Sequence, residues 1–219
     1  MRTTRMLLAI GCVGAIALGI LVSNGSGYTI PAPAAGQWVT FGGVDPQVVN
    51  GSFNFHCCDT SQFSGYYYTQ LPVAPRVGQT LTLNYTVTGN NPVWAQAPAS
   101  GGNAQTDINP PTIHLFLWRR GDNLSCAAGS GTQGSGGYAD YRLFAARTPL
   151  VLGANQTISV KLDPTQWTGC WGNPPANMQD ELNNLLGAGV TFGGQNFAGH
   201  GIYLSGGSAT FTISSFTVQ

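Results

Sequence analysis

The sequence contains little charge. Of its 219 residues, eight are lysine or arginine and eight are aspartate or glutamate, so 7% are charged, against roughly 25% in an average soluble protein. The formal net charge is zero and no basic patch is present, which argues against nucleic acids and anionic membrane surfaces as partners. Solubility must therefore come from serine, threonine, asparagine and glutamine side chains and from the 31 glycines.

The sequence also lacks the short motifs of familiar enzyme classes. No G-x-S-x-G elbow and no H-E-x-x-H motif occur, and the three histidines are scattered. Glu181 is the only glutamate, and on a helix its neighbour Asp180 would point about 100° away from it, which does not suit the two sides of one glycosidic bond. Asp122, Asp140 and Asp163 leave open a pair of carboxylates from distant strands. The pattern favours binding over catalysis and leaves an enzyme as a third alternative.

One hydrophobic run is present, and it lies at the N-terminus. A basic segment, "MRTTR", precedes 17 uncharged apolar residues from Met6 to Val22, and "SNGSG" follows. This order predicts a secretory signal peptide over residues 1–27. Because 17 residues is also near the lower limit for a membrane span, an uncleaved N-terminal anchor stays open. We therefore expect an exported chain, secreted or at the cell surface (extracellular or periplasmic), with residues 28–219 as one domain.

The cysteines indicate a disulfide framework. Cys12 lies in the predicted signal, and Cys57, Cys58, Cys126 and Cys170 remain, an even number that predicts two disulfides in an exported chain. Because a bond between the adjacent Cys57 and Cys58 would close a strained ring, each is expected to reach Cys126 or Cys170. The alternative, a metal site at "HCCD", lacks a second pair of ligands with metal spacing.

Short runs of alternating polarity predict β-strands along the rest of the chain. In "QTLTLNYTVTG" the odd-numbered residues from Leu81 to Val87 are apolar and the even-numbered ones are threonine or asparagine, which is typical of a strand with one buried face. Similar runs recur every 8 to 15 residues or so between turn signals, as in a β-sandwich or barrel. One stretch, "NMQDELNNLLGAG", places Met178, Leu182, Leu185 and Leu186 on one side of a helix before Gly187.

Several segments carry a family resemblance. They are "VGQTLTLNYTVTG" (77–89), "TIHLFLWRRGDN" (112–123) with "YRLF" (141–144), "LDPTQWTGCWG" (162–172) and the closing run 189–218. Together they resemble secreted jelly-roll β-sandwich modules of the galactose-binding-like kind, a group that includes many carbohydrate-binding modules. The closing run also resembles that of bacterial secreted proteins. The resemblance implies an all-β, antiparallel jelly-roll-like sandwich with one short helix and a sugar ligand.

The run "TIHLFLWRR" contains the candidate binding site. Ile113, Leu115 and Leu117 form one face and are expected to lie in the core. Sugar rings stack on aromatic rings, and their hydroxyls need polar partners. The second face supplies both, and neighbouring segments add to it; the predicted ligand-binding residues are His114, Phe116, Trp118, Arg120, Asp140 and Arg142, with Trp94 closing the site.

Two alternatives to a glycan site remain open. The loop of residues 89–111 could cover these aromatic rings, which would then serve stability. Low charge, high glycine content and disulfides also describe an extracellular assembly subunit, in which an exposed edge strand such as residues 208–218 pairs between chains. No cofactor is expected apart from a structural calcium ion, for which Asp45 and Asp163 are candidate ligands.

Overall fold

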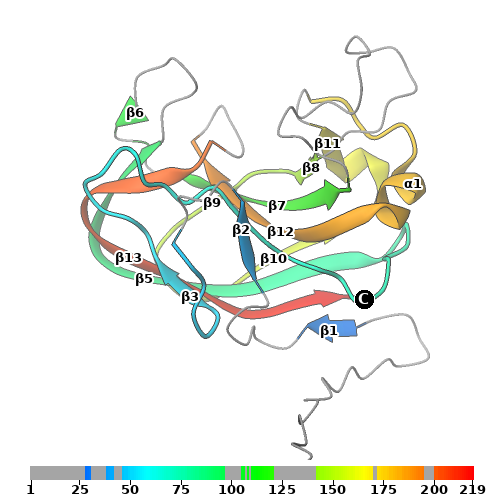
Figure 1. Ribbon diagram of the computed structural model, residues 1–219, viewed down its shortest axis with the longest axis horizontal. Helices are drawn as coiled ribbons and strands as arrows, with labels where there is room; N and C mark the ends of the chain where they lie inside the picture. The colour runs from blue at the N-terminus through cyan, green and yellow to red at the C-terminus, as the bar shows by residue number, and fades with distance from the viewer. Residues whose placement is uncertain are drawn as a thin grey trace, which may run out of the picture.

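The computed structural model describes residues 28–30, 38–41, 46–96, 105–106, 108, 110–120, 142–169, 172–194 and 200–219. Within them the chain forms two antiparallel β-sheets that lie face to face, with one short α-helix at one end (Figure 1). The prediction of an all-β antiparallel sandwich with a single short helix is thereby confirmed. Its jelly-roll connectivity stays a prediction.

The first sheet has six strands in the spatial order β1, β13, β5, β10, with β3 beside β13 and β6 beside β5. Their bounds are β1 Tyr28–Ile30, β3 Ser52–Asn54, β5 Thr80–Gln96, β6 Gln105–Thr106, β10 Gly153–Lys161 and β13 Ile202–Val218. Strands β5 and β13 run side by side along their length (Figure 1). Because β13 has β5 on one side and β1 and β3 on the other, the prediction that residues 208–218 form an exposed edge is wrong.

The second sheet has seven strands in the order β11, β8, β7, β12, β4, β2, with β9 beside β7. Their bounds are β2 Val39–Phe41, β4 Tyr66–Thr69, β7 Thr112–Arg119, β8 Arg142–Ala145, β9 Thr148–Pro149, β11 Trp167–Gly169 and β12 Leu185–Gly193. The short 3₁₀ turn η1 (Pro164–Gln166) leads from β10 in the first sheet to β11 in the second.

The main core lies between the two sheets. The alternation in β5 is reproduced, since its side chains are buried at every odd position from Leu81 to Val87. Aromatic rings join the layers: Phe53 of the first sheet stacks on Tyr67 of the second, with ring centroids 4.1 Å apart and planes 6° apart. Phe211 also stacks on Phe53, at 5.5 Å.

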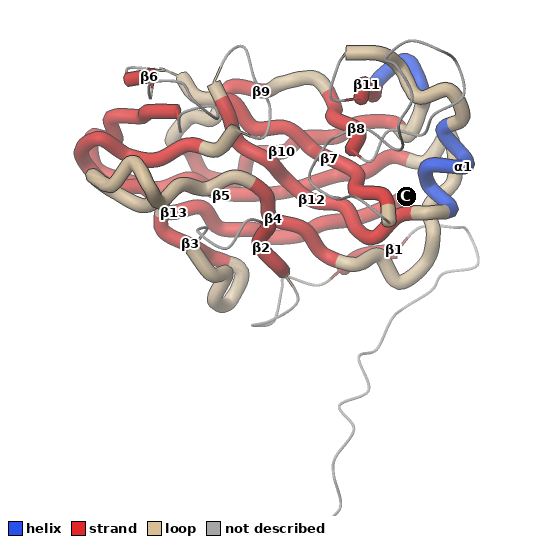
Figure 2. Tube along the Cα trace, turned by 45° about the horizontal axis from the view of Figure 1, so that its top comes forward, coloured by secondary structure: helices blue, strands red, loops and turns tan. Residues whose placement is uncertain are grey.

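The helix α1 (Met178–Asn183) covers one end of the sandwich (Figure 2). The side chain of Asn177 caps it by accepting a hydrogen bond from the backbone N–H of Asp180. Met178 and Leu182 are buried as predicted, but the helix ends at Asn183, earlier than the sequence indicates. Leu185 and the residues after it form β12 instead, because they pair with β7 in the second sheet.

Several predictions fall outside the described residues. They concern the N-terminal segment 1–27 and the side chains of Asp45, Cys126, Asp140 and Cys170. No helix in the described part of the chain has the length and apolar character that a membrane crossing requires.

Candidate functional site

The predicted binding face is the outer side of β7. Its inner side is as expected: Ile113, Leu115 and Leu117 are almost completely buried in the main core. The outer side is also buried, because only 1% of Phe116 and 7% of Trp118 is exposed. These two rings belong to a second apolar cluster with Tyr66 and Phe144, against which Tyr68 and Leu186 pack.

Glycines in β12 explain how this second cluster forms. Strand β12 lies between β7 and β4, with Gly187 opposite Trp118 and Gly189 between Phe116 and Tyr68. Without side chains on β12, rings of its two neighbours meet above it: Trp118 and Tyr68 have centroids 4.5 Å apart at 85°. A Cβ on Gly187 would lie 2.8 Å from the Tyr68 ring, so this position needs glycine. The aromatic residues of this face are therefore packed side chains. Their role in sugar binding stays a prediction, and Phe116 and Trp118 expose almost none of their ring surface.

His114 is likewise part of a packed polar arrangement. Its ring Nδ1 lies 3.0 Å from the carbonyl oxygen of Ala145 and its Nε2 lies 3.3 Å from the hydroxyl of Thr112. Burial lowers the pKa of His114 below its ordinary 6.5, and the charge of Arg147 lowers it further, against the opposing effect of the Ala145 carbonyl. Burial therefore favours the neutral ring of His114 more strongly than the ring of an exposed histidine.

Of the other predicted ligand residues, Arg142 lies opposite Trp118 in the β7–β8 pair, as expected for neighbouring strands, whereas Trp94 lies elsewhere. Trp94 is buried in the main core, where its ring packs edge-on against Phe55 at 4.9 Å, so the prediction that it closes a site over β7 is wrong. Arg142 is buried, with its guanidinium 5.3 Å from the centre of the Tyr66 ring. Arg120 is exposed after the end of β7.

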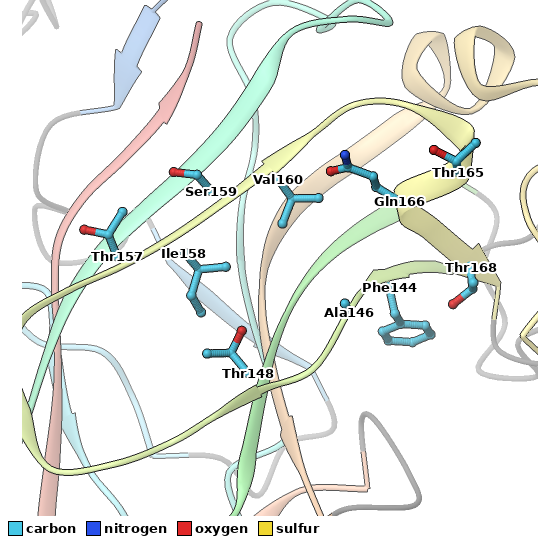
Figure 3. A pocket seen from close by; sticks show the side chains of 10 residues that line it. All are labelled: Phe144, Ala146, Thr148, Thr157, Ile158, Ser159, Val160, Thr165, Gln166 and Thr168. Carbon is cyan, nitrogen blue, oxygen red and sulfur yellow. The ribbon is translucent and has the colours of Figure 1, made fainter.

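A groove with a volume of about 610 Å³ runs along one side of the sandwich, where β10 of the first sheet faces β8, β9 and β11 of the second (Figure 3). Ten residues line it: Phe144, Ala146, Thr148, Thr157, Ile158, Ser159, Val160, Thr165, Gln166 and Thr168. None of the ten is charged. Ile158 and Val160 point from β10 toward the segment that carries Ala146 and Thr148, so the floor of the groove is apolar (Figure 3).

Three side chains at the groove keep polar groups available. Gln166 accepts a hydrogen bond from the backbone N–H of Lys161 through Oε1, at 3.1 Å, which fixes the amide and leaves its Nε2 as a donor. Among the described residues, the hydroxyls of Thr148 and Thr168 have no hydrogen-bond partner. Thr165 differs, because its hydroxyl donates to Asp163 at 2.7 Å and lowers the pKa of that carboxyl.

The exposed edge of β10 adds backbone groups to the same groove. The N–H of Leu162 donates to Gln79 beside β5, so the backbone groups of Lys161, Ser159 and Thr157 face away from β5. Those of Lys161 are bonded to the side chains of Gln166 and Trp167. Within the part of the chain that the structure describes, the outward N–H and C=O groups of Thr157 and Ser159 are unpaired.

The cysteine prediction needs a correction. Cys57 and Cys58 form a disulfide with each other, and Cys126 and Cys170 lie outside the described residues. Cys58 has a positive φ of 70°, and this unusual backbone accompanies the closed ring that the adjacent positions were expected to disfavour. No metal-binding group of three or more histidines, cysteines or acids occurs among the described residues. Asp163, the described calcium candidate, caps η1 through Thr165.

Sequence reasoning did not select the groove. Its residues come from three separate segments, and only one of them, "QTISVKLD", carries a clear alternation that predicts a strand. Nothing in that pattern says that β10 lies at an edge.

No protein-family model, curated protein or solved structure matches the chain.

Proposed function

We propose that the protein is an exported, non-catalytic binding protein for a neutral polysaccharide, and that the groove beside β10 holds the sugar chain. The observation that carries the proposal is the composition of the groove: an apolar floor, free hydroxyl and amide groups above it, and no charge among its ten lining residues. Sugars present apolar C–H faces together with hydroxyls that both donate and accept hydrogen bonds, which is the complement of such a surface.

The polar groups in the groove suit sugar hydroxyls. The Nε2 of Gln166 is a donor held in place by the bond that its Oε1 accepts. The hydroxyls of Thr148 and Thr168 can donate or accept. Backbone donors and acceptors of Thr157 and Ser159 stand in a row along β10, which favours a ligand that extends along the strand. The ten lining residues include no acid, so the groove does not offer the pair of carboxylates that glycosidic cleavage ordinarily uses, which supports binding without cleavage.

Retention on a panel of polysaccharides tests the proposal. The panel contains cellulose, chitin, xylan and mannan as neutral polymers and alginate as an acidic one. We expect retention on at least one neutral polymer, and we expect Thr148→Val with Thr168→Val to weaken it. Two lost hydrogen bonds of about 1 kcal/mol each correspond to binding weaker by about 30-fold.

Thr88→Val is the matched control, because Thr88 is an exposed strand threonine outside the groove. It should bind like the unchanged protein. Failure of every neutral polymer to retain the protein would refute the proposal, as would equal affinities of the groove variant and the control.

The exposed edge of β10 favours a second candidate function, assembly of copies of this chain by strand pairing. Unpaired backbone groups on an edge strand are the usual attachment point for an added strand. Sedimentation of the ligand-free protein separates the two functions. Concentration-dependent oligomers that Ser159→Pro abolishes would favour assembly, since proline removes the outward N–H of Ser159.

A further inference from the structure

The loop that joins β3 to β4 is fastened to the beginning of β13. The N–H of Cys58 donates to the carbonyl of Leu204 at 2.6 Å, and the N–H of Leu204 donates to the carbonyl of His56 at 2.8 Å. Farther along the loop, Ser64 and Ile202 exchange two backbone hydrogen bonds of 2.8 and 3.0 Å. The disulfide between Cys57 and Cys58 lies at the first of these two attachments.

This disulfide is accessible from solution. Both Cys57 and Cys58 are exposed, in contrast to Phe55 and Leu204, which lie beneath the loop in the main core. Cys58 is also held in the left-handed backbone region, at a φ of 70°, which residues other than glycine rarely adopt. The ring closed by the disulfide and the hydrogen bond to Leu204 keep the residue there.

We propose that Cys57 and Cys58 form a reversible thiol–disulfide exchange site whose substrate is a small dithiol in the surroundings of the protein. A thiolate of the dithiol attacks one sulfur of the Cys57–Cys58 bond, which breaks and leaves the other cysteine as a thiol. The second thiol of the reagent then displaces the protein from the mixed disulfide. Two electrons and two protons pass to Cys57 and Cys58, and the reagent becomes a cyclic disulfide.

Reduction of the disulfide weakens the attachment of the loop to β13. Once the ring is open, Cys58 can leave the left-handed region, and its N–H then loses the alignment with the Leu204 carbonyl. The attachment at Ser64 and Ile202 does not involve the disulfide and stays in place. Reduction of the disulfide therefore loosens one end of the loop and leaves the sheets intact.

Peptide mapping of the full chain tests the connectivity. The native protein is alkylated without a reductant and digested. We expect the peptide with Cys57 and Cys58 to carry no alkyl group, to have no crosslink, and to gain two alkyl groups after reduction. A crosslink from Cys57 or Cys58 to Cys126 or Cys170 would overturn the proposal, and so would alkylation of either residue before reduction.

A second measurement tests whether reduction opens the disulfide and loosens the loop in the folded protein. Treatment with dithiothreitol without denaturant should open the bond, and phenylarsine oxide, which bridges two neighbouring thiols, should then bind one per chain. Hydrogen exchange at the amide of Cys58, which donates to the Leu204 carbonyl, should become about tenfold faster, which is the expected effect of releasing one residue from the left-handed region. Exchange at Ile202 should change little.

Cys57→Ser with Cys58→Ser is the control, since it lacks the bond at all times. It should show the fast hydrogen exchange at the amide of position 58 without dithiothreitol and bind no phenylarsine oxide. A disulfide that opens only in denaturant would overturn the proposal, as would unchanged hydrogen exchange at the amide of Cys58 after reduction.

Discussion

Replacing Trp118 by alanine separates a packing role from a binding role for the outer face of β7. Only 7% of this side chain is exposed, and its ring meets that of Tyr68 edge to face at 4.5 Å. Truncation of a buried tryptophan costs about 3–5 kcal/mol, from lost apolar burial and from the cavity left behind. Because the cluster around Trp118 is smaller than the main core, we expect a value near the lower end, about 3 kcal/mol.

Urea unfolding followed by far-UV circular dichroism measures this effect without relying on tryptophan fluorescence, which the substitution itself changes. With a slope of about 2–3 kcal/mol per M, a loss of 3 kcal/mol moves the midpoint down by about 1–1.5 M. Trp118→Phe should lose less, because it keeps an aromatic ring beside Tyr68. Val93→Ala provides a control at an exposed apolar position, with an expected change below about 0.5 kcal/mol.

A loss of less than about 1 kcal/mol in Trp118→Ala would refute the packing role, since a ring packed as described cannot be removed at so small a cost. Loss of polysaccharide retention in such a stable variant would point back to Trp118 as a binding residue. Retention comparable to that of the unchanged protein, together with the lowered midpoint, would assign the ring to packing.

Two further predictions concern polar groups. Arg119→Met should destabilise the fold by about 3 kcal/mol in urea unfolding, because the guanidinium of Arg119 lies 3.0 Å from the buried carboxylate of Glu181. The double variant Arg119→Met with Glu181→Gln should recover part of this loss. If the stability losses of the two single variants simply add in the double variant, the pairing is contradicted. His114 should make the protein less stable as the pH falls below its ordinary pKa of 6.5, since the unfolded chain takes up the proton first and the buried neutral ring resists it. The difference in unfolding midpoint between the unchanged protein and His114→Gln should vary between pH 7.5 and 5, and a constant difference would contradict the assignment.

Alternation along single strands predicts which residues enter the main core. In β7 the positions of Ile113, Leu115 and Leu117 follow from a period of two, because a strand of a sandwich has one face toward the opposite sheet. Whether the other face is buried could not be predicted from the sequence of β7 alone. Burial of Trp118 depends on the glycines of β12, which lie about seventy positions later in the sequence and become its neighbours only once the sheet has formed.

The Cys57–Cys58 disulfide and the groove were not predicted from the sequence, for different reasons. The pairing of Cys57 with Cys58 is accompanied by a positive φ at Cys58, which no residue pattern around it indicates. The groove requires knowledge of which strand lies at an edge, and edges are set by the order of strands in space. The segment of Thr148, the strand of Ile158 and the turn of Gln166 meet only because β10 ends the first sheet.

The hydrogen bonds on the outer face of the first sheet favour the groove over that face as the proposed binding site. That face is covered with threonine, serine and asparagine, which by composition alone would suit a sugar equally well. Its polar groups, however, bond across the strands: Asn84 donates to Ser215 at 2.8 Å and accepts from Thr157 at 2.6 Å, and Thr82 and Ser159 are 2.9 Å apart. A ligand there would have to displace existing bonds, which reduces its net gain. Thr148 and Thr168 have no such partners among the described residues, so a sugar hydroxyl gains more free energy in the groove than on the broad polar face.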